Sequence, residues 1–440
     1  MSRSSFDFWR SDGMTASEIA MKYANDKRNA PRLCSGRRIF LRDAAACVLA
    51  LLGASRGPRA VSATDTGALR DVRARTLRYI ENMRFEGQPY GRYRYAAEMP
   101  EPTLYSSTYA AMTRGLYRDL GSLTDAERRE WVEYLQSHQE EDGLFADPRI
   151  AGEGWYKGDP EWCGRRHLSC HVVAALTCLG TVAQKPFRWL EPFFDEHHMT
   201  AWLEAREWQQ NADTVGNEVL NVGTLLQYAR DFQQEPRAAD AVRTMLEWLA
   251  HHQVKAETGL WGSFDTSDNK GLSRGVQGAY HFWLLFFYDR KALPYPERAV
   301  DHVLRTENPA GGFGWGVHGP RSSACEDIDS IDPLARMTFL ADYRKQEIQQ
   351  ALQRALPHVL SNHNEDGGFS FIRGATFTYG HPLLSSSSNG SGMFPTWFRT
   401  LSLAYLGKAL PDSMAGGFNW DFQNCPGIQF WLVNNGESDT

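Results

Sequence analysis

Apolar residues recur with the period of an α-helix along most of the chain. Between positions 219 and 228 they fall at helical spacing, which predicts a helix with one buried face. Between positions 281 and 288 nearly every residue is apolar or aromatic, which predicts a helix that is buried all round. The pattern therefore predicts alternating outer and inner helices.

A glycine-aromatic motif ends several of these helical segments. Copies lie at positions 142–145, 258–261, 311–313 and 366–369, and weaker copies lie at 91–93 and 416–418. Glycine supplies the positive φ that stops a helix, and the aromatic ring can then fold back onto the junction. The aromatic residues are Tyr93, Phe145, Trp261, Phe313, Phe369 and Phe418.

These aromatic residues are about 50 to 58 positions apart, with one double interval between Phe145 and Trp261. We expect a degenerate copy of the motif near Trp202. Each interval has room for two helices and their connections. The sequence thus predicts an all-α fold, a single (α/α)6-type toroid of helix pairs over residues 64–440.

Residues 1–63 differ from the rest of the chain. Arg37 and Arg38 are followed by an apolar run from Ala44 to Ala54 and by small residues at 61–63. This order is typical of a twin-arginine export signal, and the run is too short to span a bilayer. We expect export to the periplasm or cell surface. The alternatives are an uncleaved anchor on the membrane surface and a start codon placed too far upstream.

Composition narrows the classes of function. The net charge is −6 and the mean hydropathy is −0.48, so we expect a soluble globular protein without a nucleic-acid partner. The chain has 14 Trp, which favours a ring-lined pocket for a hydrocarbon, a cation or a sugar. The five cysteines beyond the leader have no tight spacing, which argues against a disulfide framework.

The glycine-aromatic repeats resemble the QW-type repeats of the terpenoid cyclase and protein prenyltransferase superfamily, which includes squalene-hopene cyclase. The resemblance covers about residues 70 to 425 and implies an α/α toroid. It says less about the reaction, because the same fold carries polysaccharide lyases, glycosidases, lanthionine cyclases and thioester domains. Triterpene cyclases join two helical barrels, whereas this chain has room for one.

The densest acidic cluster runs from Glu326 to Asp332. Asp332 precedes a proline, which predicts a helix start there, with Asp327 and Asp329 in the loop before it. The segment resembles the Asp-x-Asp-Asp motif of class II terpene cyclases, with Ser330 in place of the last acid. That resemblance implies Asp329 as the proton donor, tuned by Asp327 and Glu326, and it requires no metal or cofactor. Cation binding and a solvated loop are the alternatives.

A second group of residues has spacing that could hold zinc. Cys163, His167, Cys170 and His171 fall on one face of a segment that becomes helical toward Val172. Fragments of this segment also resemble the zinc ligands of lanthionine cyclases, where the two pieces lie far apart. We favour a different interpretation, in which these residues form a packed helix start or a polar stripe that lines the barrel, and we expect no metal.

Several polar and aromatic residues fall on or near loops between repeats. A toroid brings such loops together at one mouth, so we expect them to bind substrate. They are Trp315, His318, Tyr379, His381, Trp397 and Arg399.

Three functions follow from these features. The leading prediction is a terpenoid-cyclase-like enzyme that cyclises an isoprenoid by proton donation in a central aromatic cavity. The second is an exported polysaccharide lyase or glycoside hydrolase, in which Tyr and His act as acid and base and Arg binds uronate carboxylates. The third is a binding toroid without catalysis. In each case the partner is a small or oligomeric substrate in the central cavity, and the N-terminal segment could add contact with a membrane surface.

Overall fold

The structure is a computed structural model that describes residues 63–209 and 212–432. The chain divides into two units, Met1–Ala60 and Val61–Thr440, and the second is described here by itself. The predicted export signal, including Arg37 and Arg38, lies outside the described residues. Within the described residues, no helix is both long and apolar enough to cross a membrane.

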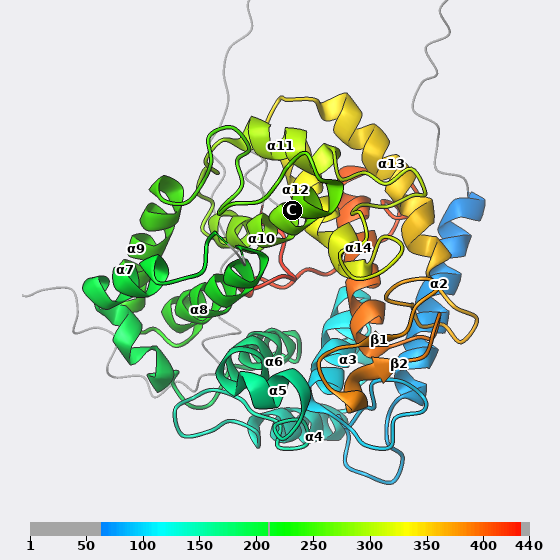
Figure 1. Ribbon diagram of the computed structural model, residues 1–440. Helices are drawn as coiled ribbons and strands as arrows, with labels where there is room; N and C mark the ends of the chain where they lie inside the picture. Colours follow the sequence, from blue (N-terminus) through cyan, green and yellow to red (C-terminus); the bar gives the residue numbers. More distant parts are fainter. Residues whose placement is uncertain (1–62, 210–211, 433–440) are drawn as a thin grey trace, which may run out of the picture. The chain divides into compact units, whose positions relative to one another are not determined.

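Six helices form a closed inner ring. Each packs against the next along the chain, and the last helix, α14, packs against both α12 and the first, α3. Figure 1 shows these helices around the centre of the unit. The inner helices are α3 (Leu104–Leu116), α6 (Leu168–Cys178), α8 (Ala212–Phe232), α10 (Asn269–Tyr288), α12 (Ala324–Leu340) and α14 (Met393–Ala409).

Six more helices cover the ring from outside, each preceding an inner helix in the chain (Figure 1). They are α2 (Ala63–Asn82), α4 (Asp125–Gln136), α7 (Glu196–Glu204), α9 (Ala238–His251), α11 (Pro296–Leu304) and α13 (Lys345–Ser361). Short elements in the loops include α5 (Gly154–Gly158), a π-helix over Pro160–His167 and the two-stranded ladder of β1 (Phe377–Thr378) with β2 (Ser385–Ser386). The predicted all-α toroid of helix pairs is confirmed.

The glycine-aromatic motifs are tight turns that bury their aromatic ring. Each of five turns is closed by a bridge to a residue six to nine positions earlier, such as Gln139 with Phe145. Tyr93, Phe145, Trp261, Phe313 and Phe369 are all at most 1% exposed. Gly143 has a φ of +92°, and a Cβ there would lie 2.2 Å from the carbonyl oxygen of Pro186. This turn therefore requires glycine, both for its positive φ and for the close approach of the backbone.

Two copies of the motif differ from the expectation. Trp202 lies within helix α7, and the buried ring at that junction is Trp208, which is 2% exposed. The last copy has no such bridge, and its Phe418 is only partly buried. Its ring packs on Trp420 and Tyr117 instead.

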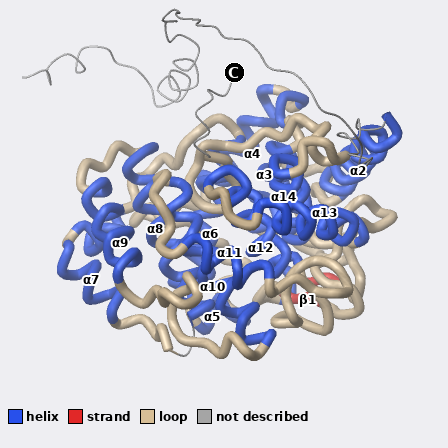
Figure 2. Tube along the Cα trace, turned by 90° about the horizontal axis from the view of Figure 1, so that it is seen from above, coloured by secondary structure: helices blue, strands red, loops and turns tan. Residues whose placement is uncertain are grey.

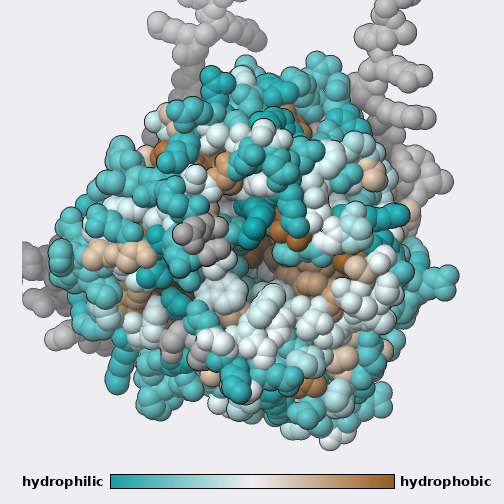
Figure 3. Space-filling view, viewed as in Figure 1, coloured by the Kyte–Doolittle hydropathy of each residue, from teal (hydrophilic) through white to brown (hydrophobic). Residues whose placement is uncertain are grey.

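Five of the turns, and the junction around Trp208, lie at one end of the ring. Each joins the end of an outer helix to the loop before an inner helix, so the inner helices begin at the same side. The last copy, at 416–418, instead follows the inner helix α14. We call this side the mouth. Figure 2 shows α5 and β1, which belong to its loops, along one edge of the unit. Figure 3 shows a hollow near the centre of this face, bordered by hydrophobic surface.

Candidate functional site

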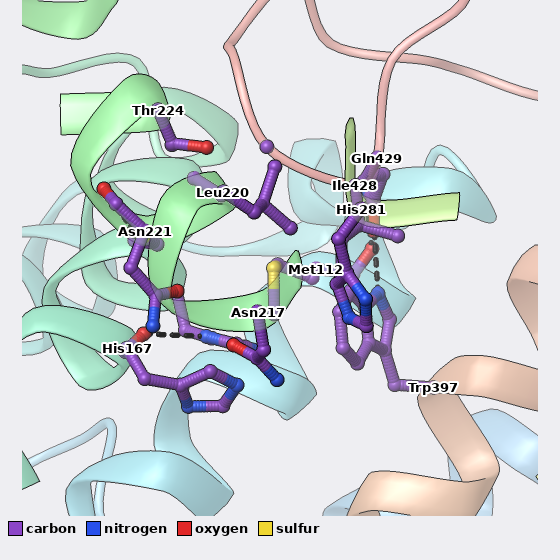
Figure 4. A pocket seen from close by; sticks show the side chains of 14 residues that line it. Met112, His167, Asn217, Leu220, Asn221, Thr224, His281, Trp397, Ile428 and Gln429 are labelled. Atoms are coloured by element: carbon purple, nitrogen blue, oxygen red, sulfur yellow. Dashed lines mark hydrogen bonds between the residues drawn. The ribbon is translucent and has the colours of Figure 1, made fainter. Parts of the chain in front are cut away.

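A pocket lies inside the ring. Its walls come from α3, α6, α8, α10 and α14, and its lining residues are Met112, His167, Cys170, His171, Ala174, Asn217, Leu220, Asn221, Thr224, His281, Trp397 and residues 427–429. The cavity volume is about 30 Å³, within about 400 Å³ of empty space that includes its opening. A cavity of that volume has room for one or two water molecules. In Figure 4, Asn221 and Thr224 lie on one side and His281 and Trp397 on the other.

The C-terminal segment forms the floor of the pocket. The Gln429 side chain accepts a hydrogen bond from Trp397 Nε1 (2.7 Å) and donates one to the Met112 carbonyl (3.1 Å). Arg336 donates to the Phe430 carbonyl (2.7 Å). Both Met112 and Arg336 lie in the last turns of inner helices, away from the mouth. The segment therefore closes the ring at the far end, as Figure 1 shows for the red trace.

His167 is held between two tyrosine hydroxyls at the top of the pocket. The Tyr105 hydroxyl donates to the Cys163 carbonyl (2.7 Å), so the contact between Tyr105 Oη and His167 Nδ1 (2.7 Å) requires a proton on Nδ1. Burial and the neighbouring His171 and His281 hold the pKa of His167 well below its usual range, so the ring is neutral. Its Nε2 must then accept the hydrogen bond from the Tyr379 hydroxyl, at 3.1 Å.

His171 and His281 each have one ring nitrogen that bonds to no group among the described residues. The Nδ1 atom of His171 donates to the His167 carbonyl (2.8 Å), and that of His281 donates to the Gln277 carbonyl (2.7 Å). Burial lowers the pKa of both rings to about 4. Both rings are therefore neutral at pH 7, and each Nε2 carries a lone pair that can accept a proton or a hydrogen bond.

One face of α8 presents unpaired polar atoms to the pocket. Asn217, Asn221 and Thr224 are spaced by four and three residues, so they share a face of the helix. We call these three residues the α8 strip. Among the described residues, the Asn217 Oδ1, Asn221 Nδ2 and Thr224 Oγ1 atoms have no hydrogen-bond partner. Because these three residues also line the pocket, a ligand there can bond to their unpaired atoms.

The lining of the pocket carries no charge. None of the described lining residues is Asp, Glu, Lys or Arg, and its three histidines are neutral. A carboxylate buried there would lack a counter-charge, which makes its burial costly. The geometry therefore combines proton acceptors and neutral hydrogen-bond groups in one small space.

The acidic cluster lies elsewhere and starts a helix. α12 begins at Ala324, and Ser323 forms a capping box with Glu326. The expected helix start at Asp332 is wrong, because Asp332 and Pro333 lie inside α12. The expected loop position of Asp327 and Asp329 is wrong for the same reason. A Ser-x-x-Glu pattern is the signal that marks this helix start.

Asp327 and Glu326 use their oxygens within the fold. Asp327 is fully buried, pairs with Arg399, accepts from the Phe313 N–H (2.7 Å) and lies 3.3 Å from His358 Nε2. Burial alone would raise the pKa of Asp327, but the Arg399 guanidinium and His358 bring it below its usual range. Glu326 caps α12 and accepts from the Val317 N–H at 2.9 Å.

Asp329 differs from Asp327 because no Lys, Arg or His side chain among the described residues pairs with it. It is 4% exposed, and its hydrogen-bond partner is the Gln277 side chain. Burial and the nearby Glu326 raise the pKa of Asp329 well above the usual value, which favours its protonated form. It does not line the central pocket.

The six residues expected to bind substrate divide into three groups. Trp397 lines the pocket, and Tyr379 binds the pocket histidine His167. Trp315, His318 and His381 lie in loops at the mouth, where His381 accepts from the Leu383 N–H (3.1 Å) and His318 contacts Gln277 (3.1 Å). Arg399 is fully buried in its ion pair with Asp327, so substrate cannot reach it.

The Cys/His segment forms a stripe that lines the barrel. His167, Cys170 and His171 face the pocket, whereas Cys163 is fully buried outside it. The Cys170 thiol donates to the Asn221 carbonyl (3.5 Å). The described residues include no group of three or more His, Cys, Asp and Glu side chains that could hold a metal ion. The segment from Pro160 to His167 is a π-helix, a form that often accompanies functional sites.

Comparisons with known proteins identify no family for this chain. No protein-family model matches the sequence, and no curated protein matches it. Among solved structures, a glycosyl hydrolase family 88 protein from Bacteroides vulgatus has 12% identity and a TM-score of 0.47, over 77% of this chain and 97% of that chain. A protein from Actinoplanes has 13% identity and a TM-score of 0.43, over 77% and 99%. We therefore base function on the site alone.

Sequence reasoning missed the α8 strip, Tyr105 and His281. The α8 strip lies in a segment whose apolar residues showed helical spacing, and polar residues in such a helix usually face solvent. Tyr105 precedes a run of Ser and Thr and carried no motif. The Cys/His segment with His167 and His171 and the predictions for Trp397 and Tyr379 were the signals that pointed to the pocket.

Proposed function

We propose that this chain is an enzyme that cleaves a glycan through His and Tyr acid–base chemistry in the central pocket. The observation that carries the proposal is the hydrogen-bonded chain from Tyr379 through His167 to Tyr105 at the top of the pocket. A binding toroid without catalysis has no need for titratable groups in this arrangement.

The acid and the base are separate groups. The Nε2 atom of neutral His171 takes a proton from the substrate or from an attacking water. The Tyr379 hydroxyl, whose pKa is raised well above 10 by desolvation, gives its proton to the leaving oxygen. The proton held by His171 then returns to the Tyr379 oxygen, which restores both groups. His171 and His167 have ring centroids 4.4 Å apart, which supports transfer through His167.

The polar side chains of the pocket support a glycan as the ligand. Histidine, asparagine and threonine side chains lie among apolar ones such as Met112 and Leu220, and their polar groups can bond to sugar hydroxyls. No carboxyl group of the described residues lines the pocket, so hydrolysis by a carboxylate pair gains no support here. The aromatic rings at the mouth, among them Trp155 and Tyr379, offer faces for sugar rings.

The test is turnover of an oligosaccharide panel by the full chain, with product analysis by mass spectrometry. A product with a new double bond indicates elimination, and a product that has gained water indicates hydrolysis. Tyr379→Phe is expected to lower kcat by about a hundredfold, a typical loss for a general acid. Tyr343→Phe, whose hydroxyl bonds Asp301 near the surface, is the control. Equal rates for the two variants would refute the role of Tyr379.

Asp329 favours one second candidate, proton-initiated cyclisation of an isoprenoid. Burial and the nearby Glu326 raise its pKa well above the usual value, which favours the protonated form that such a donor needs. A polyprenyl panel tests this candidate, with Asp329→Asn as the variant. Cyclised products from the parent chain and none from Asp329→Asn would support it over glycan cleavage.

Export by the twin-arginine route is a further proposal, and so is contact of the N-terminal segment with a membrane surface. Its support is the order of Arg37, Arg38 and the apolar run from Ala44. Fractionation of cells that express the full chain and an Arg37→Lys, Arg38→Lys variant tests it.

A further inference from the structure

The α8 strip has the character of a binding surface. Asn221 is 2% exposed and Thr224 is fully buried, yet the Asn221 Nδ2 and Thr224 Oγ1 atoms have no partner among the described residues. An unpaired buried polar atom destabilises the folded chain, so a group that supplies the missing partner is bound favourably. These atoms border the pocket, where a ligand can supply that partner.

The chemistry of the pocket restricts what the α8 strip can bind. Asn221 Nδ2 is a donor, Asn217 Oδ1 is an acceptor, and Thr224 Oγ1 is both. The open Nε2 atoms of neutral His171 and His281 add two acceptors. A hydroxyl group, which donates and accepts at once, matches this set. A carboxylate only accepts, and the uncharged lining offers it no cation.

The size of the pocket limits the group further. The cavity volume of about 30 Å³ has room for a small end group such as a hydroxyl or hydroxymethyl. The ring itself would lie higher, where Trp155 is 49% exposed and stands 5.7 Å from Tyr379 by ring centroids. An end group can thus enter the pocket while aromatic faces hold the ring outside.

We infer that Asn217, Asn221 and Thr224 recognise the uncharged, hydroxyl-bearing end group of a neutral glycan. This inference rests on the proposed function for its ligand class, but it does not depend on catalysis. It also predicts that the carboxylate of a uronate does not enter the pocket.

The first experiment measures thermal unfolding of the full chain without ligand. Thr224→Val and Asn221→Leu keep the shapes of the side chains and remove their unpaired polar atoms, so each is expected to raise Tm by a few degrees. Thr113→Val is the matched control on α3, because the buried Thr113 hydroxyl is already bonded to the Tyr109 carbonyl (2.7 Å). Lower Tm values for both α8 variants would show that these atoms support the fold, and would overturn the inference.

The second experiment probes binding with a glycan array of neutral and uronate oligosaccharides. We expect neutral glycans to bind, and Asn221→Leu and Thr224→Val to weaken that binding about tenfold each, as loss of a hydrogen bond does. Binding confined to uronates, or no glycan binding at all, would overturn the inference.

Turnover separates this inference from the proposed function. Suppose that neutral glycans bind, that the α8 variants weaken this binding and that the parent chain releases no product. The inference about the α8 strip then holds and the cleavage proposal fails. If instead glycans are cleaved and the α8 variants bind them as well as the parent chain does, the cleavage proposal holds and the inference about the α8 strip fails.

Discussion

The start of α12 and the middle of α8 both place polar side chains on inner helices, but they use them differently. At the start of α12, the Asp327 carboxylate forms a buried ion pair and accepts a hydrogen bond from a backbone amide. The Glu326 carboxylate forms the capping box and accepts from a second backbone amide. On α8, Asn221 and Thr224 keep their polar atoms unpaired beside a pocket. The carboxylates of α12 are paired within the fold, whereas the unpaired atoms of α8 border the pocket and are available to a ligand.

The largest expected effect tests the structural role of the α12 cluster. Asp327→Ala leaves the Arg399 guanidinium buried without a carboxylate, because Arg399 is fully buried and this is its ion pair. The free energy of unfolding is expected to fall by about 3 to 5 kcal/mol. Urea unfolding measures it. Asp240→Ala, which removes an exposed pair with Arg243, should cost less than about 1 kcal/mol. Similar losses in both variants would contradict the comparison.

The second prediction concerns the pH dependence of the neutral pocket. Burial lowers the pKa of His171 to about 4, from an unfolded value of about 6.5. The stability from this group is present above pH 6.5 and is lost as pH falls toward 4, because the unfolded chain gains a proton first. The loss amounts to about 3 kcal/mol in this window. His171→Gln should flatten the slope in urea unfolding series, whereas the exposed His251→Gln should not.

The smallest expected effect concerns the aromatic mouth. Trp155→Ala removes an exposed ring beside Tyr379, so the KM for a glycan substrate should rise several-fold, as loss of one ring contact predicts. Stability and kcat should change little. Phe339→Ala, another exposed ring, lies at the far end of α12 and should leave KM unchanged. A fall in kcat with no change in KM would place Trp155 elsewhere in the mechanism.

The sequence predicted the fold well because its signals are local. The five turns around Tyr93, Phe145, Trp261, Phe313 and Phe369 depend on glycine conformation and on one aromatic ring, both of which can be read within a few residues. The shared mouth follows from the same repeat. The error at Asp332 arose because a proline within a helix resembles a helix start, while the true signal lay at Ser323.

The site was harder to predict because ring closure creates it. His167 lies in the sequence far from Tyr379, and their contact depends on the mouth loops meeting. The α8 strip alternates with buried apolar residues such as Leu220 and Leu225, so the helix reads as packed on several faces. Only the closed ring shows that one of those faces borders an empty space. The acidic cluster from Glu326 to Asp332 has the denser pattern in the sequence, yet Asp327 and Glu326 serve the fold through an ion pair and a capping box.

The floor made by residues 427–429 has a consequence for biosynthesis. Those residues leave the ribosome after every helix of the wall, from α3 to α14. Gln429 docks at this floor by bonding to Trp397 and to the Met112 carbonyl. The pocket can therefore gain its floor only after all the helices of its wall have been synthesised, and a chain that ended before residue 427 would lack that floor.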